Sequence, residues 1–140
     1  MTIIDASIQI NKPVDIVFGF VSNPANNKVL TTGITDVVIN GPIGVGTRFT
    51  IKGQAYGRVY STENEIVAFE PNKKYAVKTL AAPPASDVTN TSVFEAVDGG
   101  TKLTVSMDVS IFPGTEGMVM PQLKNMLASS AATYKQLIEG

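Results

Sequence analysis

The 140-residue sequence predicts a single α+β domain with an antiparallel sheet, and three observations lead to that prediction. A segment of alternating hydrophobicity near the start leads into one helical pattern. Six further strand-like segments then follow one another with turn signals between them, and the chain ends in a long segment of helical periodicity. Successive strands with helices kept to the ends are typical of α+β folds. Neither a repeat nor a linker-like stretch divides residues 1–140, so we expect one domain throughout.

The first element is the segment IIDASIQI, residues 3–10. Its even positions are isoleucine or alanine and the odd positions between them are polar, a pattern that predicts a half-buried strand. The sequence NKP then starts a helix, because Pro13 suits the first helical turn. Asn23 and Pro24 end this helix, and a second, short helix is expected over residues 25–30.

The middle of the chain is predicted to consist of strands. The longest segment is expected to bend near Thr62, because it is long for one strand. Asp98, Gly99 and Gly100 form a strong hairpin signal before the last strand. The six segments are ITDVVIN (34–40), TRFTIKG (47–53), AYGRVYSTENEIVAFE (55–70), YAVKTL (75–80), DVTNTSVFEAV (87–97) and TKLTVSMDVSIF (101–112).

A terminal helix is predicted over residues 115–138 from apolar residues that recur at helical spacing. Tyr134 lies on this stripe and presents its hydroxyl either to a ligand or to the sheet. The stripe consists of Val119, Leu123, Met126, Leu127, Ser130, Tyr134 and Leu137.

Composition excludes several classes of function. The formal net charge is −1 and the eleven Lys and Arg are scattered, so no nucleic-acid partner is expected. The chain has no cysteine and no histidine, which excludes thiolate or imidazole metal sites, a cysteine nucleophile and any His-dependent triad. No carboxylate cluster has metal-ligand spacing, so we expect neither a metal nor a cofactor. The N-terminus has no basic stretch and no long apolar run, which predicts no signal peptide, no membrane span and a cytoplasmic location.

The stretch GPIGVGTRF, residues 41–49, comes close to a phosphate-binding loop. Such a loop needs a lysine followed by serine or threonine after its last glycine and lies between a strand and a helix. Here Thr47 and Arg48 stand in those places, and the following residues alternate like a strand. The glycines and Pro42 instead suit a tight turn. We expect a turn between two strands, with Phe49 facing inward and Arg48 facing solvent.

A second cluster, AYGRVY, places Tyr56, Arg58 and Tyr60 on one face of a strand. If the glutamates at positions 63 and 65 face water, these three side chains face the interior, where Arg58 would anchor an anion or a carbonyl group. The alternative is a β-bulge that inverts the phase and leaves Arg58 in solvent or paired with a structural carboxylate. The sequence leaves both readings open.

Further polar side chains and several methionines fall at predicted inward positions. Asn90 and Ser92 have the parity of Phe94, which indicates either a cavity that is not wholly apolar or a splayed or edge strand. Four of the five methionines fall late in the chain, including Met107 and Met126. They either fill ordinary core or line a tolerant ligand pocket.

Together these segments resemble START-like proteins of the polyketide cyclase/dehydrase type. IQINKPVDIVFGFVSNPANN resembles the family's opening, and GPIGVGTRF, FEPNKKY and FEAVDGGTKLTVSM resemble later family patterns. The likeness covers nearly the whole chain. It implies a helix-grip fold, in which a strongly curved seven-stranded antiparallel sheet, with two short helices after the first strand, wraps a long C-terminal helix around a deep hydrophobic cavity. Many members carry tryptophans where this chain has NNKVLTTG (26–33), so the ligands of those relatives do not transfer to it.

The resemblance implies binding of a hydrophobic or amphipathic small molecule that is lipid-, steroid- or polyketide-like. Two alternatives stay open: a cyclase/aromatase-type enzyme that uses Tyr and Arg hydrogen bonds in the same cavity, and a structural or partner-binding module without a ligand. A homodimer is a candidate assembly, and Arg58 with the tyrosines is the expected polar anchor. The expected lining residues are Phe49, Tyr56, Arg58, Tyr60, Tyr75, Ser92, Phe94 and Met107 from the sheet and Leu123, Met126, Leu127, Ser130 and Tyr134 from the helix.

Overall fold

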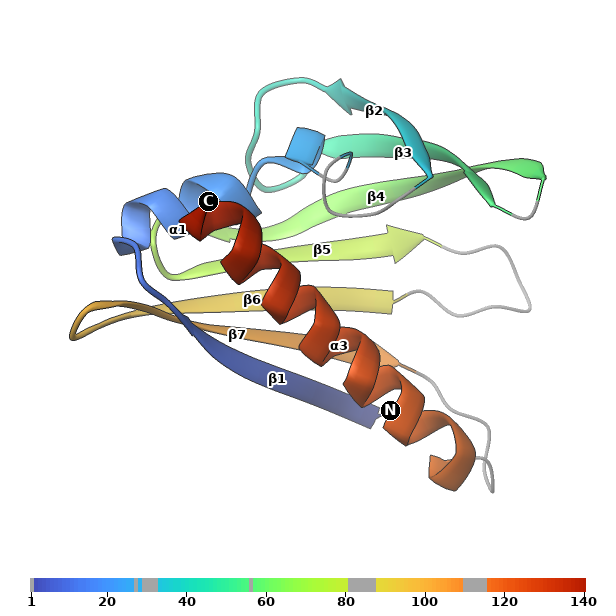
Figure 1. Cartoon of the computed structure of the whole chain (residues 1–140). Helices are drawn as coiled ribbons and strands as arrows, with labels where there is room; N and C mark the ends of the chain where they lie inside the picture. The colour runs from blue at the N-terminus through green and yellow to red at the C-terminus, as the bar shows by residue number, and fades with distance from the viewer. Residues whose placement is uncertain (1, 27, 29–32, 56, 81–87, 110–115) are drawn as a thin grey trace.

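The fold is a seven-stranded antiparallel sheet with a long helix lying across one face, in a computed structural model that describes residues 2–26, 28, 33–55, 57–80, 88–109 and 116–140 (Figure 1). The strand order is β1-β7-β6-β5-β4-β3-β2, and every neighbouring pair is antiparallel. This confirms the predicted helix-grip architecture. The elements are β1 (Thr2–Ile10), α1 (Val14–Val21), the 3-10 helix η1 (Pro24–Asn26), β2 (Ile34–Asn40), β3 (Arg48–Ala55), β4 (Arg58–Glu70), β5 (Lys74–Leu80), β6 (Val88–Val97), β7 (Gly100–Val109) and α3 (Glu116–Glu139).

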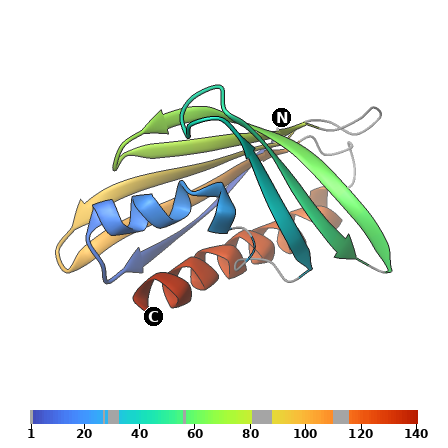
Figure 2. The same cartoon turned by 90° about the horizontal axis from the view of Figure 1, so that it is seen from above.

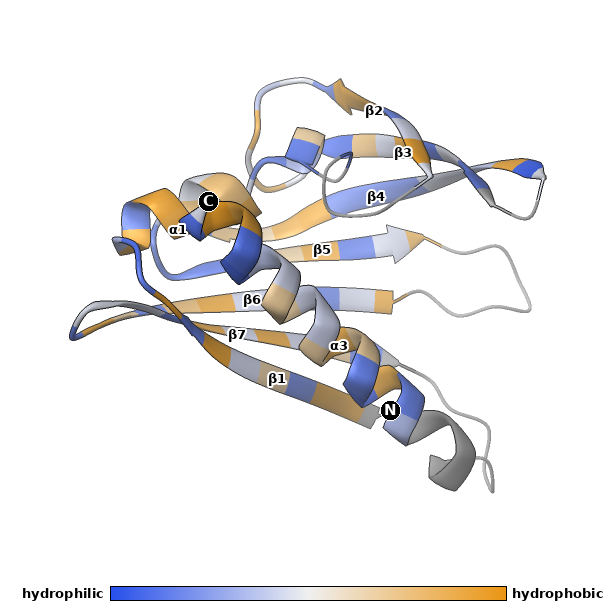
Figure 3. Ribbon diagram, viewed as in Figure 1, coloured by the Kyte–Doolittle hydropathy of each residue, from blue (hydrophilic) through white to orange (hydrophobic). Residues whose placement is uncertain are grey.

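The inner face of the sheet carries the core because side chains alternate along each strand. On β1, Ile4 and Ile10 are buried, whereas Ile3 on the opposite face is 69% exposed. Leu103 and Val105 of β7 are buried on the same inner face. Figure 3 shows this alternation of hydrophobic and hydrophilic residues along the strands. Seen from above in Figure 2, the sheet arches over α3, so that this apolar face is concave.

The short helix α1 closes one end of the concave face. Its Phe18 ring makes edge contacts with Phe69 of β4, at a centroid distance of 5.3 Å, and with Phe94 of β6, at 5.1 Å. Val17 and Val21 on the same side of the helix are also buried. The second predicted helix is a single 3-10 turn, η1, and most of the remaining positions expected for it lie outside the described residues.

Two details of the predicted elements are wrong. β4 has its irregularity between Ile66 and Ala68, not near Thr62, and the extra residue lets Phe69 rather than Ala68 pair with Tyr75 and reach the core. On the part of α3 whose side chains are described, residues 121–139, the buried residues are Leu127 and Ala131, whereas Leu137 is 38% exposed. The apolar stripe therefore runs through different positions in the last turns than the sequence pattern predicted.

The stretch at residues 41–47 is the predicted turn between β2 and β3. Gly41 and Gly46 have φ values of 103° and 90°, a region that glycine adopts without strain. The Thr47 hydroxyl donates to the Pro42 carbonyl and accepts from the Gly44 amide, which closes the loop on itself. The Gly44 amide therefore serves the turn, and the Gly46 amide donates to the Ile66 carbonyl of β4 at 2.8 Å.

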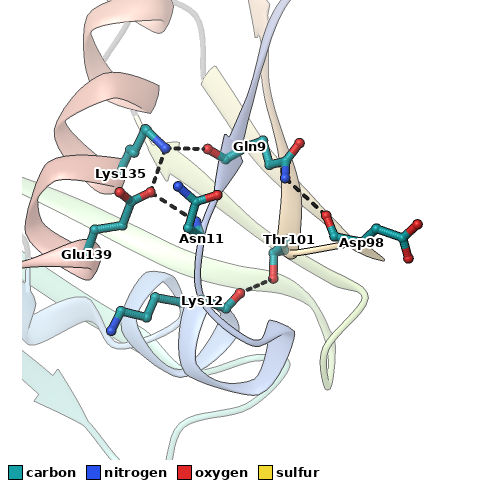
Figure 4. A network of polar contacts seen from close by, with 7 residues as sticks. All are labelled: Gln9, Asn11, Lys12, Asp98, Thr101, Lys135 and Glu139. Atoms are coloured by element: carbon teal, nitrogen blue, oxygen red, sulfur yellow. Dashed lines mark hydrogen bonds and ion pairs between the residues drawn. The ribbon is translucent and has the colours of Figure 1, made fainter.

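The C-terminal end of α3 is fastened to the end of β1 by a polar network (Figure 4). The Lys135 ammonium donates to the Gln9 carbonyl at 2.8 Å and to Glu139 Oε2 at 2.6 Å. The same carboxylate oxygen accepts from the Asn11 amide at 2.9 Å. One ion pair thus connects the last helical turn to two backbone groups of the first strand and the segment that follows it. None of the helices in the described ranges is long and apolar enough to span a membrane.

Gly100→Ala is expected to destabilise the protein. A Cβ at Gly100, the first residue of β7, would overlap the Ile10 carbonyl oxygen and lie 3.0 Å from the Asn11 Cα, and backbone atoms cannot move aside cheaply. We expect a loss of about 1–3 kcal/mol in the free energy of unfolding, measured by urea titration. Gly44→Ala is the control, because a Cβ there meets nothing within 4 Å. Equal stabilities of the two variants would contradict this account.

Glu139→Gln tests the clamp between α3 and β1. Hydrogen bonds from Lys135 and from the Asn11 amide hold the pKa of Glu139 below its ordinary value. A carboxylate with a lowered native pKa stabilises the fold above the pKa of the unfolded chain, and that contribution is lost as the pH falls through the native pKa. The wild type should therefore be more stable than Glu139→Gln at neutral pH, and the difference should disappear in strongly acidic buffer. A stability difference that stays the same in strongly acidic buffer would contradict this role of the carboxylate.

Candidate functional site

A cavity of about 230 Å³ lies between α3 and the concave face of the sheet. It forms because α3 packs mainly against β1, with lesser contacts to β7 and α1, while the sheet continues past it and curves back over it. From the sheet it is lined by Phe49, Ile51, Asn64, Tyr75, Val77, Thr79, Asn90, Thr91, Ser92, Val105, Ser106 and Met107. From the helices and the segment after α1 it is lined by Val21, Asn23, Met126, Leu127, Ser130 and Tyr134.

The cavity reaches solvent beside two lining residues of α3. Met126 lines the cavity and is 46% exposed, and Ser130, one helical turn further on, is also exposed. Leu127, which directly follows Met126 in the helix, is only 4% exposed and lines the interior of the cavity. A mouth of this kind gives a small molecule access without opening of the sheet.

Asn64 on β4 is the most deeply placed amide of the site. It is 3% exposed, and its side-chain nitrogen donates to the Thr62 carbonyl at 3.1 Å and to the Phe49 carbonyl at 3.4 Å. Its oxygen accepts from the Thr79 hydroxyl at 2.7 Å. The amide orientation is therefore fixed by partners on three strands, and the bonds that it makes satisfy a buried polar group.

Two tyrosines face the cavity from opposite walls, Tyr75 from β5 and Tyr134 from α3. The Tyr75 ring makes an edge contact with Phe69 at 6.2 Å, and the Tyr134 ring makes one with Phe20 at 6.4 Å. Burial raises the pKa of Tyr75 above its ordinary value, and the nearby Tyr134 raises it further. Burial also raises the pKa of Tyr134 to about 12. Both phenols are therefore neutral hydrogen-bond donors near pH 7.

The polar positions predicted on β6 belong to the cavity wall. Ser92 is 9% exposed and lies directly opposite Tyr75 in the register of β5 and β6. Asn90 also lines the cavity. β6 lies between β7 and β5 in the sheet, so the alternative of an edge strand does not apply.

Eight of the expected lining residues lie around the cavity, and four others that the structure describes do not. Arg58 is exposed, and Tyr60, also exposed, lies across Gly53, where an added Cβ would come within 2.6 Å of its hydroxyl. Both have the inward parity of Asn64, but they lie on the β3–β4 hairpin, which projects away from α3 (Figure 1). The expected anchor at Arg58 therefore has no place in this cavity.

Two further expected residues belong to the core instead of the cavity lining, and one is not described. Phe94 is buried, but it packs in the core with Phe18 instead of lining the cavity. Leu123 packs against the edge of the core and is not part of the lining. Tyr56 lies outside the described residues. The residues around the cavity that were expected from the sequence are Phe49, Tyr75, Ser92, Met107, Met126, Leu127, Ser130 and Tyr134.

The most informative residues that sequence reasoning missed are Asn64 and Thr79. Asn64 has the same parity as Arg58 and Tyr60, for which an inward orientation was considered, so the alternation alone could have found it. Thr79 has the same parity as Tyr75 on β5, so the alternation could have found it as well. Neither residue could have been recognised as a hydrogen-bonded pair, because that requires the register of β4 against β5. Among the described residues no three Asp or Glu lie close enough together to hold a metal ion.

With this geometry established, the comparison with known families is decisive. The profile of a family described as "Polyketide cyclase / dehydrase and lipid transport" matches residues 1–139. The chain belongs to this family. The resemblance noted in the sequence is thereby confirmed. No curated protein matches the chain.

Solved structures share the fold of this polyketide cyclase/dehydrase family member. The crystal structure of Ara h 8.0201 has a TM-score of 0.77 at 17% identity and covers 98% of this chain and 97% of that chain. The di-domain ARO/CYC BexL from the BE-7585A biosynthetic pathway also has a TM-score of 0.77 at 17% identity, and this chain spans 50% of it. MLL2253 from Mesorhizobium loti has a TM-score of 0.75 at 20% identity, covering 99% and 97% of the two chains. At these identities the likeness is evidence for the fold alone.

Asn64→Asp tests the amide network of the site. A carboxylate would set an acceptor against the carbonyls of Thr62 and Phe49, to which the Asn64 amide now donates. We expect a loss of at least about 2 kcal/mol in the free energy of unfolding at pH 7. Burial raises the pKa of a carboxyl, so the folded variant binds the extra proton and the loss should become smaller at acidic pH. Asn90→Asp, at an exposed position of the same cavity, is the matched control; an equal loss there would contradict the role given to the network.

Proposed function

We propose that this protein binds an apolar or amphipathic small molecule in the cavity between the sheet and α3. The observation that supports this most directly is the cavity itself: about 230 Å³, reaching solvent beside α3, and lined by eight apolar residues, two tyrosines and eight Asn, Ser or Thr residues. Sites for small molecules are built in this way. A water takes about 30 Å³ in the liquid, so the space corresponds to about seven or eight waters. A closed structural module needs no such space.

The volume favours a compact ligand. Pockets for drug-sized molecules span about 300–1,000 Å³, and this cavity falls just below that range. Among lipid-, steroid- or polyketide-like molecules, a compact one with only one or two rings would fit inside. A longer one would extend through the mouth beside Met126 and Ser130. We propose Phe49, Tyr75, Ser92, Met107, Met126, Leu127, Ser130 and Tyr134 as contacts.

A cyclase/aromatase-type reaction is the second candidate. Two observations favour it: the similarity in fold to BexL, which is described as an ARO/CYC, and the two neutral phenols that face the cavity. Phenols of this kind would hydrogen-bond to a carbonyl oxygen or an enolate that develops on a bound substrate.

The expected cytoplasmic location, the lack of a nucleic-acid partner and a homodimeric state remain predictions.

Ser130→Trp is the test of the binding site. The indole would occupy the mouth and part of the cavity, so affinity for the neutral fluorescent probe N-phenyl-1-naphthylamine should fall by about tenfold or more, equivalent to about 1.4 kcal/mol. Ser129→Trp is the matched control, because Ser129 is the neighbouring exposed serine of the same helix and does not line the cavity. The measurement is a fluorescence titration of both variants and the wild type. Equal affinities in the two variants, or no binding by the wild type, would contradict the proposal.

A further inference from the structure

The charges around the cavity limit what it can bind. The chain has eleven Lys and Arg, all of them in the described part of the structure, and none lines the cavity. Arg58, the cation expected there from the sequence, is exposed on a projecting hairpin. Moving a carboxylate or phosphate from water into a site without a cation costs several kcal/mol. The cavity therefore selects against anionic ligands, fatty-acid carboxylates included.

The unused hydrogen-bonding groups indicate what the cavity favours. Asn64 has its donors and acceptor occupied by Thr62, Phe49 and Thr79. The hydroxyls of Tyr75 and Tyr134, by contrast, make no hydrogen bond to any described residue. Buried hydroxyls are normally paired, so an unpaired one that faces a cavity has its partner in water or in a ligand.

The two phenols are held in place before any ligand binds. Tyr75 is 7% exposed and its ring is packed edge-on against Phe69, and the Tyr134 ring is packed edge-on against Phe20. The side chains come from opposite walls, one from the sheet and one from the helix. Fixed donors lose little conformational entropy on binding, which favours recognition of an oxygen placed between them.

We propose that the ligand is electrically neutral, with a compact apolar or aromatic body and a hydroxyl or carbonyl oxygen held by Tyr75 and Tyr134. This inference rests on the proposed binding function and specifies its ligand class. The phenols donate to a carbonyl oxygen, or one donates to and the other accepts from a hydroxyl. The apolar body lies against Val77, Val105 and Leu127, which line the same cavity.

Three naphthalenes of nearly equal size test the inference at pH 7: 2-naphthol is neutral and polar, 2-methylnaphthalene is neutral and apolar, and 2-naphthoate is an anion. The chain has no tryptophan, so naphthalene fluorescence can be followed against a tyrosine background alone. We expect 2-naphthol to bind about 3- to 10-fold more tightly than 2-methylnaphthalene, the gain that one net hydrogen bond gives. Naphthoate should bind more weakly than either.

The variants Tyr75→Phe and Tyr134→Phe identify the groups responsible. Each should reduce 2-naphthol affinity about 3- to 10-fold and leave 2-methylnaphthalene affinity unchanged. Tyr60→Phe is the control, because this phenol lies outside the cavity, and its effect should be less than about twofold. Because neither cavity hydroxyl has a protein partner, both variants should fold with unchanged thermal midpoints.

The outcomes separate this inference from the proposed function. If 2-methylnaphthalene binds as tightly as 2-naphthol, or the phenylalanine variants leave naphthol binding unchanged, the ligand class is wrong while the binding function survives. Tightest binding by naphthoate would also overturn the ligand class. If none of the three compounds binds, the binding function itself fails and the inference fails with it.

Discussion

The one-sided attachment of α3 to the sheet is the constraint on which the site depends. The helix packs on β1 through buried Leu127 and Ala131, and Lys135 and Glu139 fix its last turn to backbone groups of Gln9 and Asn11. The rest of the sheet curves over the helix without being covered by it to the same extent. The inner faces of β3, β5 and β6 therefore meet a space instead of a packed layer, and that space is the cavity.

Polar groups in such a cavity are stable only where each has a partner or access to one. Asn64 meets this condition within the protein, because its partners lie on three adjacent strands that hold the amide in one orientation. Tyr75 and Tyr134 meet it through the cavity, where water or a ligand completes their bonds. The cavity thus has one polar group whose partners lie in the protein and two hydroxyls whose partners do not.

Much of the fold could be predicted from the sequence, because alternation, turn residues and helical spacing are local signals. Parity also placed Tyr75, Ser92 and Met107 on the correct face. Parity does not say how far the helix reaches, so Arg58 and Tyr60, although on the inward face of β4, extend past it on a projecting hairpin. Nor does it distinguish core from cavity: Phe94 has the inward parity of Ser92, but the Phe18 ring of α1 fills the space beside it. Those distinctions depend on contacts between elements far apart in the chain.

The same geometry restricts any reaction that the cavity could support. A phenol whose pKa is raised by burial donates a hydrogen bond well but is a poor base near pH 7, because its anion is disfavoured by that same burial. The sequence has no histidine, and no lysine or arginine lines the cavity. Tyr75 and Tyr134 can therefore orient a carbonyl compound and stabilise charge that develops on its oxygen, but neither is suited to remove the proton that such a step releases. Among the described residues that line the cavity none is a ready proton acceptor, so a cyclisation there would leave that proton to the substrate or to water.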